Sequence, residues 1–432
     1  MENLRVFGGQ PLNGKVVPAG NKNASLPILC ATLLTSDEVT LHNLPDITDV
    51  RRFLKMFEDL GSEVSYDPVT HLGVIRHRNL SEVDPEQIPA QMRSSILLFS
   101  SLTARVGEAK FHSNTKGCAL GLREVDPHIY ALKSLGYEVD MEPEGFTFRK
   151  PMDRPSDDII YWLDYASVTA TENFIMGAVV GKGRATLHNA ACEPHVQDLC
   201  HFLKKMGAKI KGIGTNRIII EGVEGLNGCE HRIIDDHHEI ASFLAIGAMT
   251  AGKIEVEHNI NEHMGLIYRQ FQRMGIEIEH DEHGASVEGK EFYTIEPSIT
   301  PNAYPKIEAA PWPYLPADLL PPFIALGVAC KGDLLFWNKV YEGALHWIPE
   351  LTKFGAFAHV TDPHSVIIKG GLPLRAATSI ECPYIIRACI ALLMVALRVE
   401  GESVLHNASP IMRAHPNFAE KLRALGCQVT WE

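Results

Sequence analysis

The chain of 432 residues is 45% hydrophobic and 22% charged, and this length exceeds the roughly 250 to 300 residues at which single cores stop growing. Its 40 Lys and Arg against 53 Asp and Glu give a formal charge of −13, which disfavours a nucleic-acid partner or an acidic membrane surface. This charge does not exclude a small phosphorylated ligand, because the field of a cleft is set by the residues that line it. We therefore expect two or more domains and no polyanionic partner.

Three further features bear on location. The first ten residues are polar and mixed, unlike a secretory signal, and the most apolar stretch, residues 385–399, carries Arg387 and Arg398 and is shorter than the ~18 residues of a membrane span. Nine cysteines occur without a C-x-x-C pair, which argues against a disulfide framework or a structural zinc site. The sequence predicts a protein of the reducing cytoplasm.

Two sequence patterns repeat along the chain. Apolar helical runs are expected, in chain order, at residues 24–34, 94–104, 171–180, 239–250, 319–329 and 384–399. Each is followed by an amphipathic helix that ends in a large apolar residue and a glycine, which we interpret as a left-handed C-cap. These glycines recur at intervals of 68 to 80 residues, at Gly61, Gly136, Gly207, Gly275, Gly355 and Gly426. Upstream of most of them lies a strand that ends in an asparagine, at Asn43, Asn189, Asn259, Asn338 and Asn407.

The repeats predict an α/β protein of six units of about 70 residues, each with the order helix, strand, helix, strand. Units of this length are too long for common helical solenoids and too helical for propeller blades. We expect two globular domains of three units each, with sheets outside and helices packed inward. Periodicity alone does not dictate that last step, because open α/β sheets show a similar alternation.

Lys22 lies between Asn21 and Asn23 at the start of the first apolar run. A helix N-terminus offers free N–H groups and the positive end of the dipole, so an adjacent lysine makes an anion site. The alternative is an asparagine N-cap beside a solvated lysine.

Cys118 lies in a loop with Gly117 and Gly121, flanked by Lys116 and Arg123. Nearby cations favour a thiolate, so the loop predicts a reactive cysteine. The alternative is an inert, half-buried thiol.

Three arginines, Arg93, Arg387 and Arg413, stand in apolar or helix-start settings. A buried guanidinium needs an anion, which either the protein or a ligand supplies. Together with Lys22 and Arg123 they would converge if the units pack as expected. Such a cluster suits a substrate that bears both phosphate and carboxylate.

Two acidic positions have competing interpretations. Asp318 starts the fifth apolar run, where it is either functional or an N-cap. The run Asp235-Asp236-His237-His238-Glu239 has the composition of a metal cluster. Adjacent residues on a turn seldom face one ion, so we favour a polar helix start and expect no metal.

The order and spacing of these pieces resemble the enolpyruvyl transferases, and within them the branch that acts on UDP-N-acetylglucosamine. The similarity runs from end to end, and the combination of Lys22-Asn23 with the cysteine loop is its most specific part. The resemblance implies two inverse α/β barrels of three units each. One domain would comprise residues 1–21 and 233–432, with residues 22–232 inserted. Other matching segments are Met92-Arg93-Ser94, Ser167-Val168, Pro316-x-Asp318, Ile386-Arg387-Ala388 and Ile411-x-Arg413.

The resemblance further implies enolpyruvyl transfer from phosphoenolpyruvate to the 3-hydroxyl of UDP-N-acetylglucosamine with release of phosphate, the first committed step of peptidoglycan synthesis, without a cofactor. Asp318 would be the base, with Lys22 and Arg413 also catalytic. Cys118 would either act as the acid at the phosphoenolpyruvate methylene or assist the departure of phosphate, and it would be the target of fosfomycin. The cations suit a tetrahedral intermediate that keeps carboxylate and phosphate on one carbon. Phosphoenolpyruvate would contact Lys22, Arg93, Arg123, Arg387 and Arg413, and the acceptor Asn23, Arg123, Val125, Asp126, His128, Ser167, Val168, Asp318 and Tyr341.

Four positions depart from the family pattern. Ile385 stands where an aspartate is usual, Ala344 and His237 stand where arginine is frequent, and Tyr165 stands in place of a basic residue. The sequence therefore supports the reaction type more strongly than the acceptor. The alternatives are transfer to another nucleotide hydroxyl, such as that of uridine monophosphate, and a non-catalytic paralogue that binds a nucleotide sugar.

Overall fold

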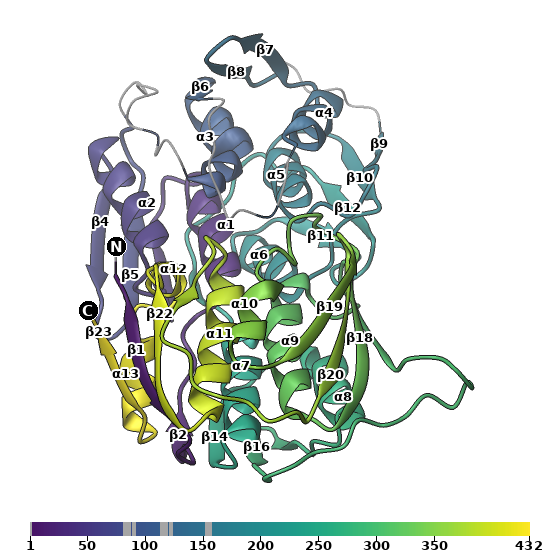
Figure 1. Cartoon of the computed structure of the whole chain (residues 1–432). Helices are drawn as coiled ribbons and strands as arrows, with labels where there is room; N and C mark the ends of the chain where they lie inside the picture. The colour runs from purple at the N-terminus through teal and green to yellow at the C-terminus, as the bar shows by residue number, and fades with distance from the viewer. Residues whose placement is uncertain (1, 81–87, 89–91, 113–119, 121–123, 152–157) are drawn as a thin grey trace. The chain divides into compact units, whose positions relative to one another are not determined.

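The computed structural model describes residues 2–80, 88, 92–112, 120, 124–151 and 158–432 (Figure 1). The chain divides into two compact units. Unit 1 comprises Met1–Pro18, Cys118–Leu122 and Asp235–Glu432, and unit 2 comprises Ala19–Gly117 and Arg123–Ile234. The resemblance implied crossings after residue 21 and near residue 233, whereas the contacts divide the chain after residues 18 and 234 and assign Cys118–Leu122 to unit 1.

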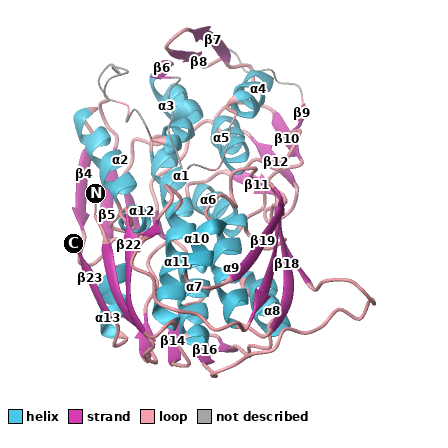
Figure 2. Cartoon of the chain, viewed as in Figure 1, coloured by secondary structure: helices cyan, strands magenta, loops and turns pink. Residues whose placement is uncertain are grey.

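Three four-stranded sheets form the outside of unit 1 (Figure 2). In each sheet the second and third strands pair antiparallel and a further strand lies parallel at one edge. The sheets are, in spatial order, β21 (Ile380–Glu381), β22 (Gly401–His406), β1 (Leu4–Gly8) and β23 (Gln428–Trp431); β15 (Glu279–Asp281), β16 (Gly284–Glu288), β14 (Lys253–Glu257) and β2 (Gly14–Val16); and β17 (Lys306–Ala309), β18 (Gly332–Asn338), β20 (Ser365–Gly370) and β19 (Phe357–Asp362).

Three apolar helices fill the inside of unit 1. They are α7 (His237–Met249), α9 (Leu320–Ala329) and α11 (Ile386–Arg398), and each contacts the other two. Every residue of α7 is buried, as expected for a helix that is apolar on all sides. The outer helices and short helical turns are α8 (Gly265–Arg273), α10 (Ile348–Lys353), α12 (Pro410–Ala414), α13 (Phe418–Ala424), η3 (Asn261–His263) and η4 (Ala317–Leu319).

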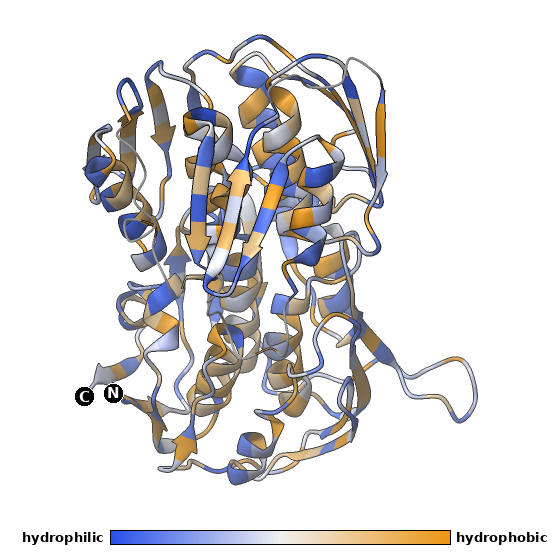
Figure 3. Ribbon diagram, turned by 90° about the horizontal axis from the view of Figure 1, so that it is seen from above, coloured by the Kyte–Doolittle hydropathy of each residue, from blue (hydrophilic) through white to orange (hydrophobic). Residues whose placement is uncertain are grey.

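Unit 2 repeats this plan. Two of its sheets again have four strands with one parallel edge strand, and three strands of the third sheet lie in the described residues. Along some of these strands hydrophilic and hydrophobic residues alternate, as in Glu108–His112 and Glu138–Glu142 (Figure 3). The sheets are β13 (Glu230–Arg232), β3 (Val39–His42), β5 (Leu72–Arg76) and β4 (Glu63–Asp67); β11 (Lys209–Lys211), β12 (Arg217–Glu221), β10 (Arg184–His188) and β9 (Ile159–Trp162); and β6 (Glu108–His112), β8 (Gly145–Arg149) and β7 (Glu138–Glu142).

The apolar helices of unit 2 also lie inside. α3 (Leu98–Val106) contacts both α1 (Lys22–Thr32) and α5 (Val168–Val179), and α6 (Pro194–Lys205) packs on the last two. All six apolar runs seen in the sequence are thus inner helices, three in each unit, which confirms the predicted pair of inverse α/β barrels. The remaining helical elements are α2 (Thr48–Asp59), α4 (Asp126–Ser134) and η2 (Arg93–Leu97). Among the helices described, none is long and apolar enough to cross a membrane.

The repeated glycines have the backbone conformation that the sequence predicts. All six have positive φ, from 78° at Gly275 to 106° at Gly207. Three of the repeated asparagines are also left-handed, with φ of 56° to 57°. Asn43 and Asn189 donate from their side chains to the carbonyls of Ile233 and Leu163, just after the parallel edge strand. The asparagine therefore joins the ends of two parallel strands, which the sequence did not reveal.

The two ends of the chain close unit 1. β1 lies between β22 and β23, with Leu4 opposite both Leu405 and Trp431. Asn3 and Glu432 exchange two backbone hydrogen bonds of 2.9 Å. These pairings join segments far apart in the sequence within one sheet of unit 1.

Candidate active site

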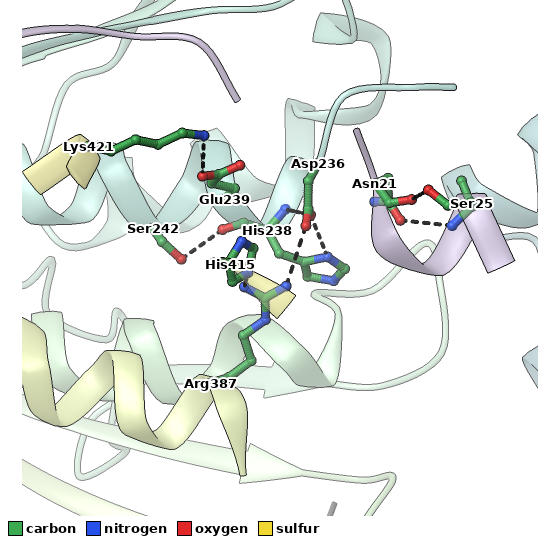
Figure 4. A network of polar contacts seen from close by, with 10 residues as sticks. Asn21, Ser25, Asp236, His238, Glu239, Ser242, Arg387, His415 and Lys421 are labelled. Atoms are coloured by element: carbon green, nitrogen blue, oxygen red, sulfur yellow. Dashed lines mark hydrogen bonds and ion pairs between the residues drawn. The ribbon is translucent and has the colours of Figure 1, made fainter. Parts of the chain in front are cut away.

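Lys22 lies in the first turn of α1, in unit 2. Asn21 caps this helix, because its side chain accepts a hydrogen bond of 3.0 Å from the amide of Ala24 (Figure 4). Nζ of Lys22 lies 2.8 Å from Oδ2 of Asp49, and the two side chains are 16% and 3% exposed. The alternative of an asparagine N-cap beside a solvated lysine was half right. An asparagine is the cap, but the lysine is paired with a buried carboxylate. Asn23 follows in the same turn and is half-buried.

The residues of unit 2 that were expected to bind the acceptor substrate lie at the starts of α4 and α5, and a histidine joins these two segments. His128, in α4, is buried, with Nδ1 3.1 Å from the carbonyl of Val125 and Nε2 2.7 Å from the hydroxyl of Thr169. Ser167 caps α5 through a 3.4 Å contact from the amide of Ala170. His128 therefore holds the start of α4 against the start of α5, and both of its ring nitrogens are engaged by protein atoms.

Other candidates in this unit differ in exposure. Asp126, the first residue of α4, is exposed, and Val168 is half-buried. Arg93 begins η2 and donates from Nη2 to the carbonyl of Glu124, 2.8 Å away. Arg93 is thereby held near the segment that carries Val125 and Asp126.

The cysteine loop is only partly described. Cys118, Lys116 and Arg123 lie outside the described residues. Leu120, which is described and belongs to unit 1, accepts a hydrogen bond of 3.2 Å from the amide of Gly343.

Asp318 is the middle residue of the short turn η4 in unit 1. It is half-buried, and its carboxylate makes no hydrogen bond or ion pair with the part of the chain that the structure describes. Pro316 and Leu319 are the N-cap residues of η4 and α9, and neither cap uses a side chain. The interpretation of Asp318 as an N-cap was therefore wrong, because neither helix start uses its side chain.

Arg387 lies in the first turn of α11 and is 8% exposed. Its Nη1 donates to Nε2 of His415 across 2.7 Å, and its Nη2 lies 3.6 Å from Oδ2 of Asp236 (Figure 4). Ile385, where the resemblance implies an aspartate, offers no charge, and the carboxylate that faces Arg387 is that of Asp236 at the start of α7. The anion that a buried guanidinium requires is thus supplied across the inner helices of unit 1.

Asp236 has two partners on its own helix. It accepts hydrogen bonds from the amide of His238 at 2.8 Å and from Nδ1 of the same residue at 3.0 Å, and so caps α7. Burial alone would raise the pKa of Asp236, but the hydrogen bond and charge of His238, followed by the charge of Arg387, lower this pKa well below its ordinary value. The carboxylate is therefore ionised at neutral pH.

The same cluster bears on the question of a metal. Ligand atoms of Asp236, His237 and His238 lie within 4.8 Å of one another, and all three residues are buried. The carboxylate, however, already caps α7 and faces Arg387, whose charge would repel a cation. This arrangement fits a helix cap and a counter-ion.

The remaining candidates lie at the C-terminal ends of two strands of unit 1. Arg413, on α12, places its guanidinium carbon 5.8 Å from the ring centroid of Tyr384. Tyr341 lies in the turn after β18, where its amide donates to Oδ1 of Asn338, 3.0 Å away. Ala344, where the resemblance implies an arginine, is buried.

Three residues of these networks escaped the sequence interpretation. Asp49 looks like an ordinary acidic residue in a first helical turn, and His415 belongs to no motif. Asp236 was noticed only as part of a polar helix start. The sequence did indicate that each buried cation needs an anion. It did not indicate which acidic residue supplies that anion.

The sequence profile of the family EPSP synthase (3-phosphoshikimate 1-carboxyvinyltransferase) matches residues 6–422. A UDP-N-acetylglucosamine 1-carboxyvinyltransferase of Bacteroides thetaiotaomicron is 36% identical, with both chains covered completely. This chain belongs to the EPSP synthase family. It is a carboxyvinyl (enolpyruvyl) transferase.

More distant relatives share the fold. A second protein named UDP-N-acetylglucosamine 1-carboxyvinyltransferase, from Borrelia garinii, is 34% identical over 98% of this chain and 97% of its own length. The enolpyruvyl transferase NikO of Streptomyces tendae superposes with a TM-score of 0.86 at 20% identity, covering 100% of this chain and 99% of NikO. EPSP synthase of Acinetobacter baumannii superposes with a TM-score of 0.77 at 17% identity, with both chains covered completely. At these identities the two solved structures show the fold alone.

Proposed function

We propose that this enzyme transfers the enolpyruvyl group of phosphoenolpyruvate to the 3-hydroxyl of UDP-N-acetylglucosamine, in the cytoplasm, as the first committed step of peptidoglycan synthesis. The observation that carries the proposal is the 36% identity, over the whole of both chains, with a relative named UDP-N-acetylglucosamine 1-carboxyvinyltransferase. The Lys22-Asn23 pair and the Cys118 loop support the same branch of the family.

The proposed reaction has two steps. The acceptor oxygen bonds to C2 of phosphoenolpyruvate while its proton passes to Asp318 and C3 takes a proton from Cys118. The C2–O bond to phosphate then breaks, C3 returns a proton to the thiolate of Cys118, and the departing phosphate takes the proton held by Asp318. The enol ether and inorganic phosphate are then released. Asp318 suits the base, because its half-buried carboxylate is engaged by no other described residue.

Cations are proposed to bind the charged groups of the intermediate. Lys22, Arg93, Arg123 and Arg413 would hold the phosphate, and Arg387 the carboxylate. These charges stabilise an intermediate that carries both anions on one carbon. The acceptor would contact Asn23, Arg123, Val125, Asp126, Ser167, Val168, Asp318 and Tyr341, with His128 holding two of these segments together.

A second candidate is transfer to another nucleotide hydroxyl, such as that of uridine monophosphate. It is favoured by the four departures, because Tyr165, His237, Ala344 and Ile385 replace charged residues of the family pattern.

The test measures phosphate release from phosphoenolpyruvate with each acceptor and with none, and takes product masses from the same reactions. Release with UDP-N-acetylglucosamine, and a product heavier by one enolpyruvyl group, would support the proposal. Release only with uridine monophosphate would establish the second candidate. Release with neither, together with tight binding of a nucleotide sugar, would indicate the non-catalytic paralogue.

A further inference from the structure

The guanidinium of Arg387 is oriented chiefly by a histidine. Its 2.7 Å hydrogen bond to Nε2 of His415 is short, whereas the 3.6 Å separation from Asp236 is an ion pair beyond hydrogen-bond length. An ion pair of this length neutralises charge without fixing direction. The direction of the guanidinium therefore depends on His415.

The contact also determines the chemical state of the histidine. A guanidinium only donates hydrogen bonds, so Nε2 of His415 must accept, and the ring is neutral with its proton on Nδ1. Burial, and then the charge of Arg387, lower the pKa of His415 to about 4, so the ring stays neutral at pH 7. The other charged groups that act on this ring are Asp236 and Glu239 from α7 and Lys421 from α13.

The ring itself is held by packing. His415 follows α12 directly, and its amide donates to the carbonyl of Ile411, 2.9 Å away. Its ring lies 5.8 Å from that of Phe418, which in turn lies 5.0 Å from the ring of Phe243 on α7. His415 is 5% exposed, and among the described residues its Nδ1 has no hydrogen-bond partner. A ring fixed in this way is a rigid acceptor.

We infer that His415 is a positioning residue that aims Arg387 at the carboxylate of phosphoenolpyruvate. The inference rests on the proposed role of Arg387. With described residues Arg387 makes one hydrogen bond, from Nη1, and one ion pair, from Nη2, so further donors of its five remain for a ligand carboxylate. Arg413 lies two residues before His415, so α12 and the residue directly after it carry a proposed phosphate ligand and the support of the proposed carboxylate ligand.

The test compares His415→Phe, which keeps the ring shape and removes the acceptor, with His415→Gln, whose amide oxygen accepts in a similar place. We expect His415→Phe to raise KM for phosphoenolpyruvate by about tenfold to a hundredfold with kcat changed less than about threefold, because a hydrogen bond to a charged group is lost. His415→Gln should return KM to within about threefold of wild type. His283→Gln, at a side chain that is 82% exposed, is the matched control.

Two further measurements separate positioning from folding and from the proposed function. Calorimetric binding of phosphoenolpyruvate is compared with that of vinyl phosphate, which lacks the carboxylate, and only phosphoenolpyruvate should bind His415→Phe more weakly. Nitrogen NMR of histidine-labelled enzyme should show a neutral Nδ1–H ring whose signal is absent from His415→Gln.

Equal weakening of both ligands, no recovery in His415→Gln, or an Nε2–H or charged ring would overturn the inference. If wild type binds phosphoenolpyruvate more tightly than vinyl phosphate but forms no product with UDP-N-acetylglucosamine, the proposed acceptor fails and the inference about His415 stands. If wild type does not distinguish the two ligands, the role of Arg387 and the inference fail together.

Discussion

Lys22 and Asp49 form an ion pair of 2.8 Å between the first turns of α1 and α2. The carboxylate is 3% exposed and the ammonium 16%, so the pair lies at the edge of the interior of unit 2. The proposed phosphate ligand is thus held in place by the protein before a substrate binds.

Removing the carboxylate of this pair should destabilise the protein. We expect Asp49→Asn to lower the free energy of unfolding by about 2 to 3 kcal/mol, below the 3 to 5 kcal/mol of a fully buried pair because Lys22 keeps some solvent contact. Urea unfolding of Asp49→Asn, Lys22→Met and the double variant measures the coupling, and the double variant should lose less than the sum. Glu221→Gln, which breaks the exposed 3.5 Å pair with Lys211, should cost about 0 to 1 kcal/mol. Strict additivity of the two changes would contradict the pair.

Asp318→Asn should lower turnover without lowering stability. The loss of a general base predicts a fall of at least about 10² in kcat. Because Asp318 makes no cap hydrogen bond, its free energy of unfolding should stay within about 0.5 kcal/mol of wild type. Asp333→Asn, at an exposed position of β18, is the control. Near-normal turnover would remove Asp318 from the reaction.

Cys118→Asp should abolish covalent labelling by fosfomycin while leaving measurable turnover. A carboxyl group can still supply a proton, but it lacks the thiolate that an epoxide alkylates. Intact mass after incubation with the drug, together with phosphate release, tests both parts. Cys229→Ser, at a half-buried thiol whose pKa is raised by burial, is the control and should label as wild type does. Continued labelling of Cys118→Asp would place the reactive cysteine elsewhere.

Glu172 should make stability fall as pH rises. This side chain is buried in α5, and burial, followed by the charge of Glu193, raises its pKa well above the ordinary 4.5. The folded state therefore keeps a proton that the unfolded chain loses above about pH 4.5, so stability is fully present below that pH and declines toward the folded pKa.

The slope attributable to Glu172 is at most about 1.4 kcal/mol per pH unit. Urea unfolding of Glu172→Gln between pH 5 and pH 8 should show a flatter profile than wild type, because the amide does not titrate. Glu138→Gln, at an exposed position of β7, should keep the wild-type slope. Parallel profiles for wild type and Glu172→Gln would show that Glu172 is ionised in the folded protein.

At Gly426 the cost of a side chain in the repeated helix caps comes from the backbone conformation alone. Its φ is +97°, and an added Cβ would meet nothing within 4 Å, so only the backbone opposes a side chain. Gly426→Ala should cost about 1 to 2 kcal/mol, and Gly426→Asn less, because asparagine tolerates the left-handed region better. Gly265, which begins α8 outside that region with open space around it, should tolerate alanine with a gain of up to about 1 kcal/mol. Thermal unfolding of the three variants compares these costs, and equal costs for alanine at both positions would contradict the cap.

The sequence alone was sufficient for the repeating architecture. Apolar runs predicted the six inner helices, and the glycine at the end of each outer helix predicted a left-handed residue that the structure confirms, for example at Gly61 and Gly355. Both signals are local: a helix buried on all sides is mostly apolar, and a left-handed cap favours a residue without Cβ.

The partners of the charged residues were decided by the tertiary structure. Nothing near Arg387 in the sequence indicates that Asp236 and His415 contact it, because these residues start or follow three different helices that meet only in the folded unit. The same holds for Lys22 with Asp49, and for β1 between β22 and β23. Local patterns determine which segments form helices and strands, whereas the choice of an anion for a buried cation depends on which segments packing brings together.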